Sequence, residues 1–170
     1  MNIELKNIKI NNAFSDETVC FKADLYVDNI KVAICVNAGC GGNTNISSYP
    51  GKEQLLNTVE VYAKSLPQID CVSFKLDSDL EIIVDSLIDD EFNKKEKEKD
   101  AKKIQKLCLT NIVFGVPNSH FSSLGYKMPI SEVLKRPDGK ELIEKLIVAV
   151  KSRMKSDDII LNTNLKEFGI

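Results

Sequence analysis

Apolar and polar residues alternate along the first third of the chain. From residue 19 to residue 27 every odd position is apolar, and the same period continues over residues 30 to 36. A period of two predicts strands with one buried face. Asp28 and Asn29, between the two runs, both tolerate positive φ and suit a two-residue turn. The pattern therefore predicts a β-hairpin over residues 19–36.

Residues 2–10 also read as a strand, but the apolar phase changes partway through, which predicts a bulge near Asn7. Later apolar residues recur every three or four positions, as in amphipathic helices, over residues 52–66, 80–88 and 142–154. Shorter apolar runs predict strands at 69–76, 109–116 and 159–161. The polar residues at 118–125 predict a loop, and a short helix is expected to start at 131. We therefore expect an α+β fold, with antiparallel N-terminal strands forming a sheet packed by three or four amphipathic helices.

Charge is unevenly distributed in the middle of the chain. Residues 77–91 contain seven acidic residues and no basic one, whereas residues 93–106 contain seven lysines. This order suits the dipole of one long or broken helix with a solvated face at 93–103. The alternative, a nucleic-acid-binding stripe, is disfavoured by the interleaved acids and the absence of aromatic residues.

The chain has no low-complexity linker, and its 170 residues fit one domain. We expect a single domain over 1–170, with a β-rich part at 1–50 and a helical, partly projecting segment at 77–108. The net charge of −2 gives no global reason to bind nucleic acid or an anionic membrane. Five irregularly spaced cysteines and no signal peptide or apolar membrane span predict a cytoplasmic protein.

A glycine-rich loop between the hairpin and the next helix is the main candidate site. Glycines let backbone N–H groups converge, and a helix N-terminus adds a positive partial charge, so such a loop can bind an anion. The residues we expect to contribute are Gly39, Gly41, Gly42, Asn43, Asn45 and Lys52. The loop is neither a Walker motif nor a dinucleotide fingerprint. The structural alternative is an irregular loop with Asn and Ser turns.

Other chemistry is less well supported by the spacing. Cys35, Cys40 and His120 could form a zinc site or a cysteine–histidine pair, but the cysteines are too far apart in sequence for a usual zinc motif. Asp85 shares a helix face with Glu81 and with Asp89, which would suit magnesium and a nuclease reaction, although a solvated face is simpler. We expect no catalytic residues, no bound metal and no cofactor.

Four segments carry a resemblance to known proteins: Glu4–Lys9, Ala13–Asp28, the glycine loop Asn37–Asn43, and Ile159–Leu165 near the C-terminus. They resemble a family of small uncharacterised proteins found in bacteriophages, prophages and other mobile elements. In that family the second hairpin strand is typically followed by Asn-Asp-Gly-x-Gly-Gly, often with cysteine and histidine nearby. This chain has Ala38 at the usual aspartate position, and it has no histidine beside the loop.

The resemblance and the loop together predict an accessory protein that acts by binding in the cytoplasm of a bacterial host. As a counter-defence protein it would sequester a small anionic, nucleotide-like ligand or inhibit a host protein. The alternatives are a metal-dependent nuclease or phosphoesterase, and a ligand-free module that mediates protein interaction. We expect no membrane or nucleic-acid partner, and a homo-oligomer is left open.

Overall fold

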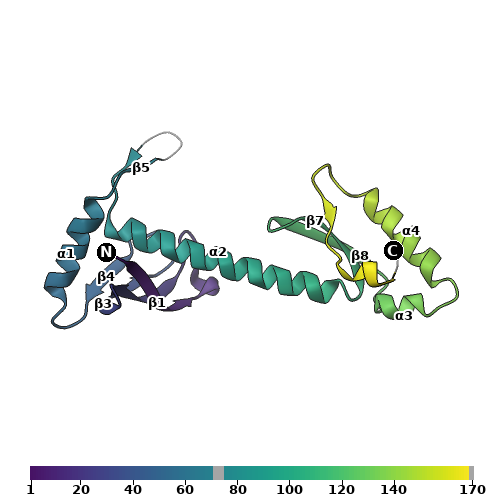
Figure 1. The fold of residues 1–170 in the computed structure, drawn as a ribbon, viewed down its shortest axis with the longest axis horizontal. Helices are drawn as coiled ribbons and strands as arrows, with labels where there is room; N and C mark the ends of the chain where they lie inside the picture. Colours follow the sequence, from purple (N-terminus) through teal and green to yellow (C-terminus); the bar gives the residue numbers. More distant parts are fainter. Residues whose placement is uncertain (71–74, 169–170) are drawn as a thin grey trace. The chain divides into compact units, whose positions relative to one another are not determined.

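The structure is a computed structural model that describes residues 1–70 and 75–168. The chain divides into two compact units, residues 1–94 and 95–170 (Figure 1). Each unit has its own hydrophobic core. This division differs from the single domain that the sequence predicted. Residues 93–103 contain only one apolar residue, Ala101, so this stretch contributes almost no apolar surface to a hydrophobic core.

The first unit contains a four-stranded antiparallel sheet in the order β1-β2-β3-β4. Its strands are β1 (Ile3–Ile10), β2 (Phe21–Val27), β3 (Ile30–Asn37) and β4 (Asn45–Ser48). The predicted hairpin is confirmed, because Asp28 and Asn29 turn the chain between β2 and β3 with φ of 48° and 67°. The bulge near Asn7 is also confirmed by a register shift between β1 and β2.

Helices α1 (Glu53–Lys64) and α2 (Leu80–Leu107) contribute to the core beside the sheet. The apolar face of β2 packs with α1 and with the first turns of α2 around Leu25, Val59, Val84 and Ile88, all at most 1% exposed. The predicted helix over 80–88 is therefore part of one continuous helix. The predicted strand at 69–76 appears as β5 (Ile69–Asp70) and β6 (Lys75–Leu76), and its positions 71–74 lie outside the described residues.

The second unit contains a three-stranded antiparallel sheet in the order β8-β7-β9. Its elements are β7 (Asn111–Val116), β8 (His120–Gly125), α3 (Ile130–Leu134), α4 (Gly139–Lys151) and β9 (Ile159–Ile160). Ile112 and Phe114 pack against α3, α4 and Leu165, so the C-terminal segment docks on the core as predicted. The polar loop expected at 118–125 is wrong, because backbone pairing with β7 forms β8 although Ser122 and Ser123 interrupt its apolar pattern.

The α+β fold class is confirmed, with the helices divided between two sheets. Among the described residues, every helix is too short or too polar to cross a bilayer.

Asp24, on β2, connects three strands of the first sheet with the segment that follows β4. Its carboxylate accepts hydrogen bonds from Tyr49 Oη at 2.6 Å and from Asn7 Nδ2 at 2.7 Å, and Lys31 Nζ lies 2.9 Å away. The Tyr49 hydrogen bond has the largest effect, and together these partners lower the pKa of Asp24 to about 2 although burial opposes the shift.

This shift predicts an acid-dependent loss of stability. A carboxylate with a lower pKa in the folded state stabilises the protein above its unfolded pKa, and this stability is lost as pH falls through about 2. We expect Asp24→Asn to lower the unfolding free energy by about 2 kcal/mol near pH 7 and by much less near about pH 1.5. Urea unfolding at both pH values would measure it. A difference independent of pH would contradict a charge-based role.

Candidate functional site

The glycine-rich loop connects β3 to β4 and does not lead directly into a helix. Gly39 and Gly41 adopt positive φ of 87° and 77°, a conformation that glycine tolerates. Strand β4 then separates the loop from α1, whose N-cap position is Lys52. The strand–loop–helix arrangement that motivated an anion site therefore does not form, because four of the intervening residues pair with β3 instead.

Buried Asn37 organises the interior of this loop. Its Oδ1 accepts from Gly39 N at 2.8 Å and from Thr18 Oγ1 at 2.9 Å, and its Nδ2 donates to the Gly42 carbonyl and to Thr44 Oγ1. Gly41 N donates to Thr18 Oγ1 at 3.3 Å. The amide groups of Gly39 and Gly41 are thus donors within the protein rather than free groups converging on a ligand.

The acidic stretch at the start of α2 lies against the same loop. Thr44 donates its backbone N–H to Glu81 Oε1 at 2.7 Å and its hydroxyl to Asp85 Oδ1 at 2.6 Å. Burial raises the pKa of Asp85, the Thr44 hydrogen bond opposes this shift, and the nearby carboxylate of Glu81 adds to it. The expectation of a simply solvated acidic face does not hold for Glu81 and Asp85.

Beside the loop lies a hollow of about 410 Å³ with acidic walls. Four carboxylate residues line it: Asp16, Glu17, Asp85 and Asp89. Such a surface repels a phosphate or a nucleotide, so the loop's surroundings oppose the anion site that the sequence predicted. Within residues 1–70 and 75–168, no group of three or more His, Cys, Asp or Glu side chains is arranged to hold a metal ion.

The remaining predicted site residues do not converge around this hollow. Gly42 and Asn43 are exposed, and neither lines it. Asn45 belongs to β4 and accepts a hydrogen bond from Ser47. Lys52 is half-buried, and its backbone N–H donates to the Tyr49 carbonyl.

The cysteine and histidine residues considered from the sequence are divided between the two units. Cys35 and Cys40 belong to the first unit, whereas His120 belongs to the second. Cys35 is buried in β3, and this burial raises its pKa to about 12, which opposes formation of a reactive thiolate. His120 Nε2 lies 3.2 Å from Asp158 Oδ1 within the second unit.

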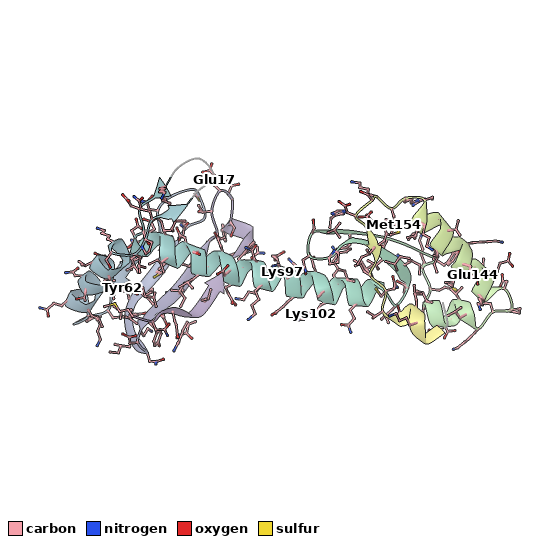
Figure 2. The ribbon with its side chains drawn as sticks, turned by 45° about the horizontal axis from the view of Figure 1, so that its top comes forward. Glu17, Tyr62, Lys97, Lys102, Glu144 and Met154 are labelled. Carbon is pink, nitrogen blue, oxygen red and sulfur yellow. The ribbon has the colours of Figure 1, made fainter. Side chains whose placement is uncertain are left out.

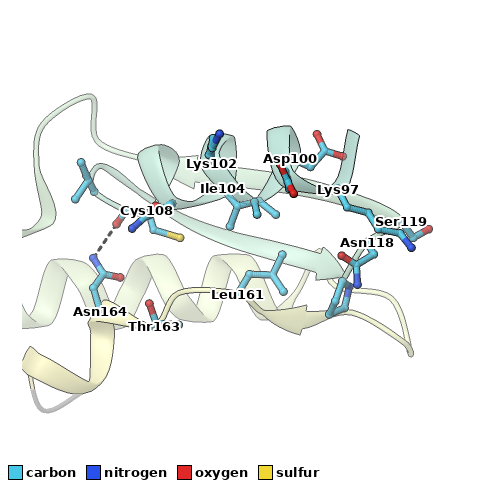
Figure 3. Close-up of a pocket in the computed structure, with 15 residues that line it drawn as sticks. Lys97, Asp100, Lys102, Ile104, Cys108, Asn118, Ser119, Leu161, Thr163 and Asn164 are labelled. Carbon is cyan, nitrogen blue, oxygen red and sulfur yellow. Dashed lines mark hydrogen bonds between the residues drawn. The ribbon is translucent and has the colours of Figure 1, made fainter. Parts of the chain in front are cut away.

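The larger hollow is a groove of about 700 Å³ in the second unit, which the sequence did not reveal (Figure 3). One wall is the C-terminal part of α2, and the other is the C-terminal segment that follows β9 (Figure 3). Apolar groups dominate its lining. The apolar lining residues are Ala101, Ile104, Cys108, Leu109, Pro117 and Leu161.

A lysine and two further polar side chains lie at one end of this groove, and Thr163 and Asn164 lie toward the other (Figure 3). Lys97 extends toward Asn118 and Ser119 in the β7–β8 turn (Figure 3). Lys97 and Ala101 are one turn apart on the helix, and Ile104 follows at the next turn, so they share one face of α2. That spacing was visible in the sequence, but it lay within a stretch whose dense charge indicated a solvated helix.

Two asparagines hold the second wall of the groove in place. Asn164 Nδ2 donates to the Cys108 carbonyl at 2.9 Å, as drawn in Figure 3. Asn162 bonds to β7, where its Oδ1 accepts from Val113 N at 2.6 Å and its Nδ2 donates to the Asn111 carbonyl at 3.0 Å. In the segment Asn162-Thr163-Asn164, the two asparagines therefore attach the wall, and Thr163 lines the groove.

No protein-family model matches this chain, and no curated protein or solved structure matches it significantly.

Proposed function

We propose that this is a binding protein and that the groove of the second unit holds a small amphipathic ligand. The observation that carries the proposal is the combination of an apolar lining with a polar end at Lys97, Asn118 and Ser119. A volume of about 700 Å³ falls within the usual range of small-molecule sites. The acid-lined hollow beside the glycine-rich loop lacks this combination.

The ligand class that fits best is nucleotide-like, with a flat apolar body and a negative end. The body would lie against Ile104 and Leu161, where burial of apolar area supplies affinity. The negative end would lie near the Lys97 ammonium group, and the Asn118 and Ser119 side chains can donate hydrogen bonds to it. Glu98 and Asp100 also line the groove, so a ligand with one or two negative charges suits it better than a triphosphate.

The resemblance to phage and mobile-element proteins supports a biological context in which this ligand binding would be useful. In the cytoplasm of a bacterial host, such a protein would act in counter-defence by sequestering a nucleotide-like signal. The alternative hypothesis in the same context is that the protein inhibits a host protein. In that case a side chain of the partner would occupy the groove.

Filling the groove should weaken ligand binding without removing core contacts. Ala101 is exposed, lines the groove and lies within a helix. The larger side chain of Ala101→Phe would therefore occupy part of the groove and leave the core unchanged. We expect a panel of mono-, di- and cyclic nucleotides to contain a ligand that raises the melting temperature. Ala101→Phe should weaken its binding at least about tenfold. Thermal shift followed by isothermal titration would measure both effects.

Two further variants make the assignment specific. Lys97→Gln should weaken the binding of a nucleotide by about tenfold and leave the binding of the matching nucleoside unchanged. The substitution removes only the ammonium group that contacts the negative end of the ligand. Glu17→Gln, in the hollow beside Gly41, is the control and should leave binding unchanged. If no nucleotide binds, or if Glu17→Gln abolishes binding while Ala101→Phe does not, the groove is not the nucleotide site.

A further inference from the structure

The two units carry opposite net charges, although the whole chain is nearly neutral. Residues 1–94 contain 8 basic and 15 acidic residues, a net charge of −7. Residues 95–170 contain 15 basic and 10 acidic residues, a net charge of +5. The near-neutral total concealed this difference. A charge asymmetry of this kind indicates an electrostatic partner for the basic unit.

Part of the excess positive charge forms one stripe along α2. Lysines at spacings of four, three and four residues share one side of a helix, and here all are exposed: Lys95, Lys99, Lys102 and Lys106. At 1.5 Å per residue the stripe is about 16 Å long. Lys99 lies 3.3 Å from Glu96, and Lys102 and Lys106 have no ion pair with any described residue. Lys97 leaves the helix in a different direction from Lys102, toward the groove (Figures 2 and 3).

The interleaved acids do not lie within the stripe. With about 100° of rotation per residue, Glu96, Glu98 and Asp100 project at least about 70° away from the centre of the lysine stripe. The sequence-based objection to a nucleic-acid surface therefore loses much of its force when the helix is considered in three dimensions. The other objection, the absence of aromatic side chains, bears on which form of nucleic acid would bind.

We propose that this lysine stripe binds the phosphate backbone of double-stranded DNA without sequence specificity. Consecutive ammonium groups about 4.5–6 Å apart along the helix can contact successive phosphates as point charges. Because no aromatic residue belongs to the stripe, base stacking would not add affinity for a single strand. Lys102 also lines the ligand groove, but Lys95, Lys99 and Lys106 do not. The stripe therefore meets the groove at one residue, and the proposal does not depend on the groove's function.

The salt dependence of binding gives a quantitative test. Four lysine–phosphate contacts predict a slope of about −3.6 for log K against log salt, which is roughly a 150-fold loss between about 50 and 200 mM salt. Lys99→Gln/Lys106→Gln should reduce this loss to roughly 12-fold and weaken binding at least tenfold at about 50 mM salt. Fluorescence anisotropy with a labelled 20-base-pair duplex would measure these values for the full chain.

A matched variant separates the stripe from net charge alone. Lys140→Gln/Lys151→Gln removes the same charge from exposed positions of α4 and should change duplex affinity less than threefold. A single strand of the same sequence should bind no tighter than the duplex.

Three results would overturn the proposal. The first is no duplex binding at about 50 mM salt. The second is an equal loss of affinity in the two double variants. The third is salt-sensitive self-association by light scattering without duplex binding, which would make a second copy of this chain, rather than DNA, the partner.

Discussion

Replacement of Gly39 by alanine should lower the unfolding free energy of the first unit by about 3 kcal/mol or more. Gly39 has φ of 87°, a conformation that costs an L-residue about 1–2 kcal/mol. A Cβ at this position would also collide with the backbone carbonyl of Phe14 and crowd the Cys20 side chain. The Gly39 carbonyl accepts from the amides of Asp16, Glu17 and Thr18, so a shift of residue 39 would disturb this whole connection.

Two other glycines separate the causes of this effect. Gly51 has φ of 74° but open space around its Cβ position, so Gly51→Ala should cost only about 1 kcal/mol from conformation. Gly42 has neither a positive φ nor a close neighbour, and Gly42→Ala should change stability by less than about 0.5 kcal/mol. Urea unfolding, with hydrogen exchange to assign the affected residues, would rank the three variants. Equal effects for Gly39→Ala and Gly51→Ala would show that the predicted collision is relieved at little cost.

The same loop shows how far local sequence could predict the site. Its positive-φ glycines and the preceding hairpin follow from residue types within a few positions of each other. Its hydrogen-bond partners do not, because Thr18 lies 19 residues before Asn37 and Asp85 lies 41 residues after Thr44. The sequence could show that the glycines expose backbone amides, but only the fold shows that the protein itself provides their acceptors.

The groove was hidden for a related reason. Its apolar lining comes from three segments, each of which contributes only a few residues: the end of α2 with the turn after it, the β7–β8 turn, and Leu161. No local pattern marks such a site, since its composition is apparent only when the three segments are adjacent. The charged residues around Ile104 also dominated the pattern of the helix and indicated a solvated segment rather than a ligand-binding wall.

Asn162→Ala should lower the unfolding free energy of the second unit by about 3 kcal/mol. After Leu161, whose backbone N–H donates to the Val113 carbonyl, the main chain no longer pairs with β7. The Asn162 side chain then takes the place of a strand peptide, because its amide accepts from Val113 N and donates to the Asn111 carbonyl. Alanine would leave the N–H of fully buried Val113 without this acceptor, and an unpaired buried donor costs about 1–3 kcal/mol.

Neighbouring substitutions test this peptide-like role. Asn162→Asp keeps an acceptor for Val113 but faces the Asn111 carbonyl with a second oxygen, so it should be at least as destabilising as alanine. Thr163→Ala, at an exposed position, should change stability by less than about 0.5 kcal/mol. Hydrogen exchange should increase in residues 108–116 and 159–165 of Asn162→Ala and stay unchanged in residues 21–37.

Because Leu161 and Asn164 line the groove, the same variant should also weaken the binding of any ligand held there. Full ligand affinity in a variant with an exposed Val113 amide would show that the wall of the groove does not depend on this anchor.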